Sequence, residues 1–166
     1  MMQVDVQTAL RNGAHQDIPG AVHIQTWAKA AVQQAKPGRL TAKAATQMTV
    51  RIVETDEMTE LNQRYRQKTG STNVLSFPFE TPPGMPADLV VPELGDVVVC
   101  AAVVMREATE QGKTSTAHWA HMIVHGTLHL LGYDHIQNSD AQKMESLEIA
   151  ALNKLGYENP YSVQSR

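Results

Sequence analysis

Hydrophobic residues alternate with polar ones in some stretches of the chain and recur at intervals of three and four in others, which predicts strands and helices respectively. Glycines and prolines such as Pro37 and Gly112 separate these stretches. The predicted strands lie at 4–8, 48–52, 73–79 and 97–99, and the predicted helices at 19–35, 56–67, 100–111, 116–131 and 139–156.

Three local features refine this pattern. Leu61 and Tyr65 share the apolar face of the second predicted helix, so we expect Tyr65 to face the core. Residues 81–92 contain four prolines and one glycine, a composition that predicts a surface loop. Ser139, followed three residues later by Gln142, predicts a capping box at the start of the last helix.

The order of the predicted elements is strand, helix, strand, helix, strand, strand, helix, helix, helix, which is typical of an α+β fold. We expect a small mixed β-sheet packed against several helices. Pro78 predicts a strand end or an exposed edge, because proline donates no backbone hydrogen bond. The chain has no internal repeat or long linker, so we treat residues 1–166 as a single domain.

Composition places the chain among ordinary globular proteins, since 42% of its 166 residues are hydrophobic and 19% are charged. Cys100 is the only cysteine, which excludes an internal disulfide and a cysteine-rich zinc site. The longest apolar run has nine residues, too few for a membrane span, and no secretory signal is recognisable at the N-terminus. We therefore expect a cytoplasmic protein with no membrane partner.

Charge is distributed unevenly along the chain. The formal net charge of −3 gives no overall attraction to nucleic acid. Between Lys29 and Lys68, however, there are eight basic residues and four acidic ones. This segment therefore has a local surplus of four positive charges.

Histidines are concentrated in one part of the sequence, since five of the seven fall between His118 and His135. Intervals of three, four and four positions separate four of them, His118, His121, His125 and His129. On a helix this spacing gathers all four along one stripe, with apolar residues on the opposite side. The stripe is predicted to lie beside a dry core.

His125 and His129 are four residues apart, which lets two imidazoles on successive helical turns reach one metal ion. Gly132 can adopt the left-handed conformation that ends a helix, after which His135 can return to the same ion. Three neutral nitrogens around zinc leave a fourth position for water, the arrangement of a catalytic site. We predict one zinc ion held by these three histidines, on a buried helix and the turn that follows it, as in zinc hydrolases.

The other members of the cluster have weaker assignments. His121 and His125 are also four apart, but no turn follows them that would supply a third ligand, so this pair is the less favoured metal site. We expect His118 and His121 to hydrogen-bond instead to groups around the metal or to substrate. Two roles stay open for Asp134, which either orients an imidazole or caps a loop.

The spacing from His125 to His135 is similar to the ligand stretch of a group of zinc peptidases. In those enzymes the residue after the first histidine is a glutamate that acts as general base. Here that residue is Gly126, which cannot accept a proton. A metallopeptidase is therefore disfavoured, although a bound metal could still stabilise charge on a carbonyl or phosphoryl oxygen.

Four blocks of sequence, all in the expected order, carry a wider resemblance. They are LNQRYRQK at 61–68, TNVLSFP at 72–78, LGD at 94–96 and HGTLHLLGYDH at 125–135. Together they resemble the YbeY family, the single-strand-specific endoribonucleases and rRNA maturation factors of bacteria. The stretch AHWAHM at 117–122 is similar to the branch found in proteobacteria.

The resemblance implies that zinc is held by His125, His129 and His135 and that Arg66 is a catalytically important arginine. It implies maturation of ribosomal RNA, notably at the 3′ end of the small-subunit RNA, and ribosome quality control. The implied partners are single-stranded RNA, the small ribosomal subunit and its assembly factors. Many relatives carry aspartate where Thr69 stands, which leaves the role of that acid open.

The resemblance, together with the histidine spacing, implies metal-assisted cleavage of RNA phosphodiester bonds. Arg66 would stabilise charge on the phosphate, because a guanidinium binds phosphate through two parallel hydrogen bonds. Arg64 and Lys68 would help to hold the RNA, and Ser76 either lines the RNA groove or simply packs its strand. The attacking group stays open between metal-activated water and the ribose 2′-hydroxyl. A noncatalytic ribosome-assembly factor with a zinc site is the main alternative, and the oligomeric state is undetermined.

Overall fold

The strands and helices follow the predicted order along the chain. The computed structural model describes residues 3–11, 18–35, 47–79, 83–84, 93–134 and 136–161. Its strands are β1 (Gln3–Ala9), β2 (Gln47–Val53), β3 (Val74–Pro78) and β4 (Glu93–Cys100). Its helices are α1 (Ala21–Gln34), α2 (Thr55–Arg66), α3 (Ala101–Glu110), α4 (Ser115–Leu130) and α5 (Asn138–Lys154).

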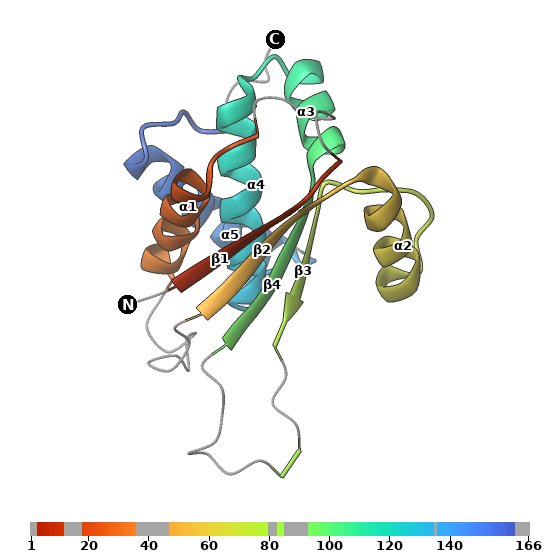
Figure 1. The fold of residues 1–166 in the computed structure, drawn as a ribbon. Coiled ribbons are helices and arrows are strands. Elements are labelled where there is room, and N and C mark those ends of the chain that lie inside the picture. Colours follow the sequence, from red (N-terminus) through yellow and green to blue (C-terminus); the bar gives the residue numbers. More distant parts are fainter. Residues whose placement is uncertain are drawn as a thin grey trace.

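The described strands form one mixed sheet in the order β1-β2-β4-β3 (Figure 1). β1 and β2 run parallel, as do β2 and β4, whereas β3 runs antiparallel to β4. β3 is an edge strand, and Pro78 lies at its end opposite Gly95. The predicted α+β class and the position of Pro78 are both confirmed.

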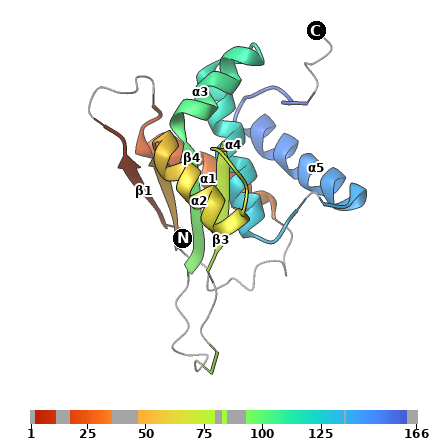
Figure 2. The ribbon, with the colours of Figure 1, turned by 90° about the vertical axis from the view of Figure 1, so that its right-hand side faces the viewer.

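Each face of the sheet has its own hydrophobic core, because successive side chains of a strand point to opposite faces. Val50 and Val97 lie in the larger core, which α1, α4 and α5 cover. Leu75 and Val98 point the other way and pack with Met58 of α2 in a smaller core. Figure 2 shows α4 and α5 on one side of the strands and α2 in the foreground. The sheet thus separates α2 from α4 everywhere except around its β3 edge.

The prediction that Tyr65 faces the core is wrong. Its side chain is 56% exposed and meets the ring of Phe77 edge-on, with the ring centroids 5.3 Å apart. Burial falls along this face of α2 from Met58 to Tyr65, because the last turn of the helix lies over the edge strand β3. Helical periodicity identifies the apolar face of a helix, but it does not predict where along the helix the packing against that face ends.

The predicted capping box is also wrong. α5 begins at Asn138 with Gln137 as its N-cap, and no side-chain hydrogen bond caps it. Ser139 therefore lies inside the first turn, where its hydroxyl cannot act as a cap. Of the predicted loop at 81–92, the structure describes only a turn at 83–84, and the predicted break at Pro37 lies outside the described residues. In the described part of the chain, no helix has the combined length and apolar character needed to cross a membrane.

Candidate metal centre

The four helical histidines form a continuous row along α4, as their spacing predicts. Ring centroids are 6.1 Å apart for His118 and His121, 6.2 Å for His121 and His125, and 4.6 Å for His125 and His129. The first two side chains are buried, whereas His125 and His129 are half-buried. The last pair is therefore the part of the row that a ligand can reach.

Gly132 ends α4 in the predicted left-handed conformation, with φ of 95°. Gly132 N–H donates to the His129 carbonyl at 3.0 Å, and Tyr133 N–H donates to the Leu128 carbonyl at 3.1 Å, the pair of bonds typical of a glycine-terminated helix. The turn brings the Tyr133 carbonyl to 2.9 Å from His129 Nδ1. A carbonyl only accepts hydrogen bonds, so Nδ1 carries the proton and Nε2 of neutral His129 keeps a lone pair.

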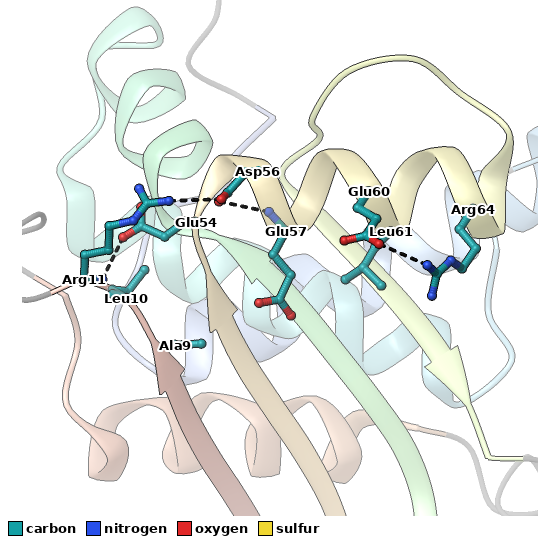
Figure 3. Close-up of a pocket in the computed structure, with 9 residues that line it drawn as sticks. All are labelled: Ala9, Leu10, Arg11, Glu54, Asp56, Glu57, Glu60, Leu61 and Arg64. Atoms are coloured by element: carbon teal, nitrogen blue, oxygen red, sulfur yellow. Dashed lines mark hydrogen bonds and ion pairs between the residues drawn. The ribbon is translucent and has the colours of Figure 1, made fainter.

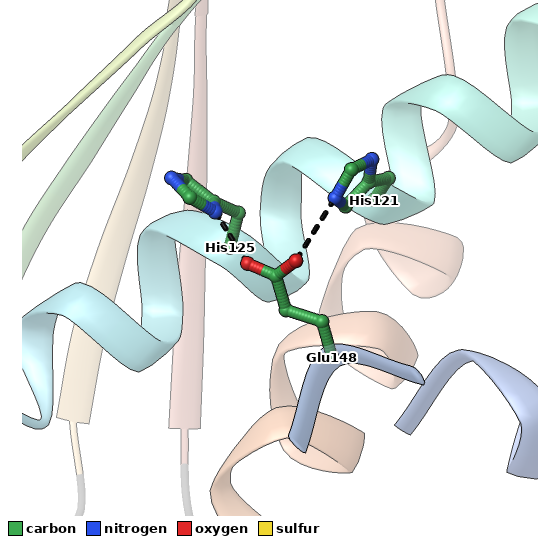
Figure 4. Close-up of side chains that lie close together, drawn as sticks. All are labelled: His121, His125 and Glu148. Atoms are coloured by element: carbon green, nitrogen blue, oxygen red, sulfur yellow. Dashed lines mark hydrogen bonds and ion pairs between the residues drawn. The ribbon is translucent and has the colours of Figure 1, made fainter. Parts of the chain in front are cut away.

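Glu148 of α5 orients His125 in a similar way. One carboxylate oxygen contacts His125 Nδ1, and the other lies 3.1 Å from His121 Nε2 (Figure 4). Complete burial by itself would raise the pKa of Glu148, but hydrogen bonds and charge from His121 and His125 outweigh it and lower the pKa to about 2. Because a carboxylate only accepts hydrogen bonds, His125 Nδ1 carries a proton, and in the neutral form of the ring Nε2 keeps a lone pair.

The two Nε2 atoms of His125 and His129 lie 3.1 Å apart. Two nitrogens bound to one tetrahedral zinc ion at about 2.0–2.1 Å are themselves about 3.3 Å apart. Two lone pairs at such a separation repel each other unless a proton or a cation lies between them. The chemistry and spacing of this donor pair fit a divalent metal ion.

A second group also offers ligand atoms. His121, His125 and Glu148 each place one such atom within 4.8 Å of the others, so this group could hold a metal ion. It uses the buried side of the His125 ring, whereas the Nε2 pair uses the side toward His129. Glu148 could not be predicted from the sequence, because it belongs to the next helix and no local spacing marks it. His135, the third predicted ligand, lies outside the described residues.

His118 and Asp134 make structural contacts. His118 Nε2 lies 2.8 Å from a carboxylate oxygen of Glu107, and burial lowers the pKa of His118 although Glu107 opposes this. Asn73, the residue before β3, donates to the same carboxylate at 3.1 Å. The carboxylate of Asp134 accepts a hydrogen bond from Ile136 N–H at 3.2 Å, which is a loop-capping contact.

Arg66 lies in the same cleft as the outer histidine pair. Its Nη2 donates to the Ser76 carbonyl at 3.0 Å, and its guanidinium lies 5.9 Å from the centroid of the Phe77 ring. These contacts hold the guanidinium at the edge of the sheet. The cleft measures about 870 Å³, and the residues lining it include Asn62, Arg66, Lys68, Ser76, His125 and His129.

Arg64, which is predicted to hold RNA together with Arg66, does not line this cleft. It pairs with Glu60 at 3.0 Å and lines a separate cleft of about 590 Å³ (Figure 3). The physical reason is helical geometry, because residues two apart on a helix do not face the same way. In the same cleft Arg11 pairs with Asp56 at 3.0 Å, and Glu57 pairs with Arg51 of β2 at 2.7 Å.

Gly126 faces the sheet rather than the cleft. A methyl group at this position would lie 2.7 Å from Val97 Cγ1 and 3.1 Å from Val74 Cγ2. The Ser76 hydroxyl donates to the Gly126 carbonyl at 2.8 Å, so α4 sits directly on β3 and β4. This position has no space for the glutamate that serves as general base in helical zinc peptidases.

The close packing at Gly126 gives a stability prediction. A methyl group at Gly126 forces the stiff Val97 side chain to move, which costs about 1–3 kcal/mol. Alanine otherwise adds about 1 kcal/mol to the stability of a helix, so Gly126→Ala should lower the free energy of unfolding by up to about 2 kcal/mol. Urea denaturation measures it, with Gly20→Ala as control because nothing lies within 4 Å of that position. A more stable Gly126→Ala protein would contradict the packing.

Comparison with known proteins gives consistent matches over most of the chain. The family model described as Endoribonuclease YbeY matches residues 11–156. A relative named Endoribonuclease YbeY from Coxiella burnetii (strain Dugway 5J108-111) is 47% identical over 161 residues, which are 97% of this chain and 99% of the relative. One of the same name from Methylococcus capsulatus is 49% identical over 156 residues, 94% of this chain and 95% of the relative.

A solved structure matches in fold. The solution structure of TM1509 from Thermotoga maritima aligns with a TM-score of 0.50 over 93% of this chain and 92% of that one, at 22% identity. At this identity the likeness concerns the arrangement of helices and strands alone.

Proposed function

Because the chain belongs to the endoribonuclease YbeY family, we propose that it is a zinc-dependent endoribonuclease that cleaves single-stranded RNA. The observation that supports this most directly is the Nε2 pair of His125 and His129, 3.1 Å apart in a cleft that Arg66 also lines. His135 completes the proposed ligand set as the third histidine.

In the proposed mechanism, positive charge surrounds the scissile phosphate. When bound, the zinc ion supplies a Lewis acid that stabilises negative charge developing on the phosphoryl oxygens. Arg66 presents its remaining N–H groups to the same phosphate, since the Ser76 carbonyl uses one of them and fixes the guanidinium plane. Lys68 lines the same cleft and attracts the RNA backbone.

The cleft favours single strands over duplexes as substrates. His125 and His129 are half-buried within it, so a phosphodiester approaches their Nε2 atoms only if its strand enters the cleft. A base-paired strand carries its complementary strand with it, which makes it too bulky to enter the cleft. An unpaired segment has no second strand and can enter.

The proposed cellular role is maturation of ribosomal RNA in the cytoplasm, at the 3′ end of the small-subunit RNA, together with ribosome quality control. The small ribosomal subunit and its assembly factors are the proposed partners. This part rests on the resemblance of four sequence blocks to the YbeY family and on family membership, rather than on geometry.

Cleavage of a labelled RNA tests the proposal, using one sequence as a single strand and as a duplex. We expect the single strand alone to be cut, activity to be lost after chelation, and zinc to restore it. A 2′,3′-cyclic phosphate end would identify the ribose 2′-hydroxyl as the attacking group, and a simple phosphate end would identify water. RNA binding without cleavage at any metal load would contradict the proposal and favour an assembly factor. Casein cleavage would favour a peptidase.

A further inference from the structure

A buried polar cluster lies behind His125, on the side away from His129. Glu148 is its centre, with a fully buried side chain that reaches from α5 to a position between the imidazoles of His121 and His125 (Figure 4). Tyr161, beyond the end of α5, closes the cluster. A fully buried carboxylate is stable only when donors satisfy it, so its partners decide what it does.

The two oxygens of Glu148 have separate partners. Oε1 accepts from the Tyr161 hydroxyl and lies 3.1 Å from His121 Nε2, which is itself 3.3 Å from the Tyr161 hydroxyl. Oε2 contacts His125 Nδ1. Two donors therefore hold one oxygen in place, and the other oxygen is directed at the ring of a candidate metal ligand.

His121 contributes to the cluster through one ring nitrogen. Its Nδ1 is buried and has no hydrogen-bond partner among the described residues. A buried ring nitrogen without a hydrogen-bond partner costs about 1–3 kcal/mol of folding free energy. Within the described part of the chain, the hydrogen bonds of the His121 ring go to Glu148 and Tyr161, so its place in the core is explained by holding the carboxylate.

The same contacts argue against Glu148 as a metal ligand. An ion held by this group would bind the ring nitrogens of His121 and His125 that face Glu148, so these nitrogens would lose the protons that they donate to the carboxylate. An ion on the Nε2 pair leaves every one of these hydrogen bonds intact. A carboxylate that orients a ligand histidine through its second ring nitrogen is a frequent arrangement at metal sites.

We propose that Glu148 is a positioning residue for the metal site, held by His121 and Tyr161, which fixes the His125 ring with Nδ1 protonated and Nε2 directed toward His129. The inference rests on the proposed function in that the ion binds the Nε2 pair. It adds the segment after α5 to the site, although this segment contributes no ligand.

Metal affinity and the proton position on His125 together test this proposal. Glu148→Gln removes the charge and keeps the shape, and we expect it to weaken zinc binding about 10- to 100-fold in competition with a chromophoric chelator. Tyr161→Phe removes one hydrogen bond and should weaken binding about 2- to 10-fold. Glu107→Gln is the matched control, because it alters the Glu107–His118 pair, the other histidine–carboxylate pair of α4, and should leave affinity within about 2-fold.

Nuclear magnetic resonance of the ¹⁵N-labelled, metal-free protein at about pH 8 reads the tautomer of His125 directly. We expect the proton on Nδ1 in the wild type. A proton on Nε2 would overturn the proposal whether or not the protein cuts RNA. Unchanged zinc affinity in Glu148→Gln would also overturn it, as would a loss equal to that of His129→Ala, which would make Glu148 a ligand. A wild type with the expected tautomer but no zinc affinity would instead contradict the proposed function.

Discussion

Replacing His129 by alanine should abolish zinc binding and slow RNA cleavage by about 10³-fold or more. The variant removes one nitrogen of the Nε2 pair, so the remaining His125 cannot form the same chelate. A metal ion supplies several kcal/mol of transition-state stabilisation, and each 1.36 kcal/mol changes a rate tenfold. Zinc content of the purified protein and single-turnover cleavage of a single-stranded RNA measure the two effects.

His23→Ala is the matched control for this variant. His23 is an exposed histidine of α1 that stacks on Trp27 with a centroid separation of 6.0 Å, away from the row on α4. It should bind zinc and cut RNA like the wild type. His129→Ala protein that is free of zinc and still cuts at the wild-type rate would show that the metal has no part in the chemistry.

Replacing Arg66 by alanine should lower the turnover of RNA cleavage by about 10²- to 10³-fold while zinc binding stays unchanged. The Ser76 carbonyl and Phe77 hold the guanidinium at the cleft, which places a fixed positive charge beside the proposed position of the phosphate. Arg66→Lys should recover only part of the rate, because an ammonium group cannot bind phosphate through two parallel bonds. Turnover at saturating RNA, compared with zinc affinity, separates the two roles.

Arg64→Ala provides the control on the same helix. It removes the same charge two residues away, but Arg64 pairs with Glu60 and lines the other cleft. Its effect should be about 3-fold or less, the size expected for an exposed ion pair and a distant charge. Equal losses in Arg64→Ala and Arg66→Ala would mean that Arg66 acts only through overall charge.

The parts of the site that sequence predicts well are local. The row of histidines follows from the helical repeat, and the end of α4 follows from Gly132, whose left-handed conformation few other residues adopt. The same turn sets the Tyr133 carbonyl against His129, within four residues of it. Neighbours in sequence thus suffice for the orientation of His129.

The orientation of His125 was not predictable in the same way. Its partner Glu148 is 23 residues further along the chain, and Tyr161 lies further still. Only the packing of α5 against α4 brings them together. Tyr65 and Arg64 show a related limit, since periodicity defines the faces of α2 but not which face meets the cleft or where the sheet ends.

The most direct test of the metal site is a crystal structure of the protein with zinc, with anomalous scattering collected at the zinc edge. We expect one strong peak about 2.0–2.1 Å from Nε2 of both His125 and His129. A peak held instead by His121 Nε2, His125 Nδ1 and Glu148, or no peak beside the Nε2 pair, would contradict it.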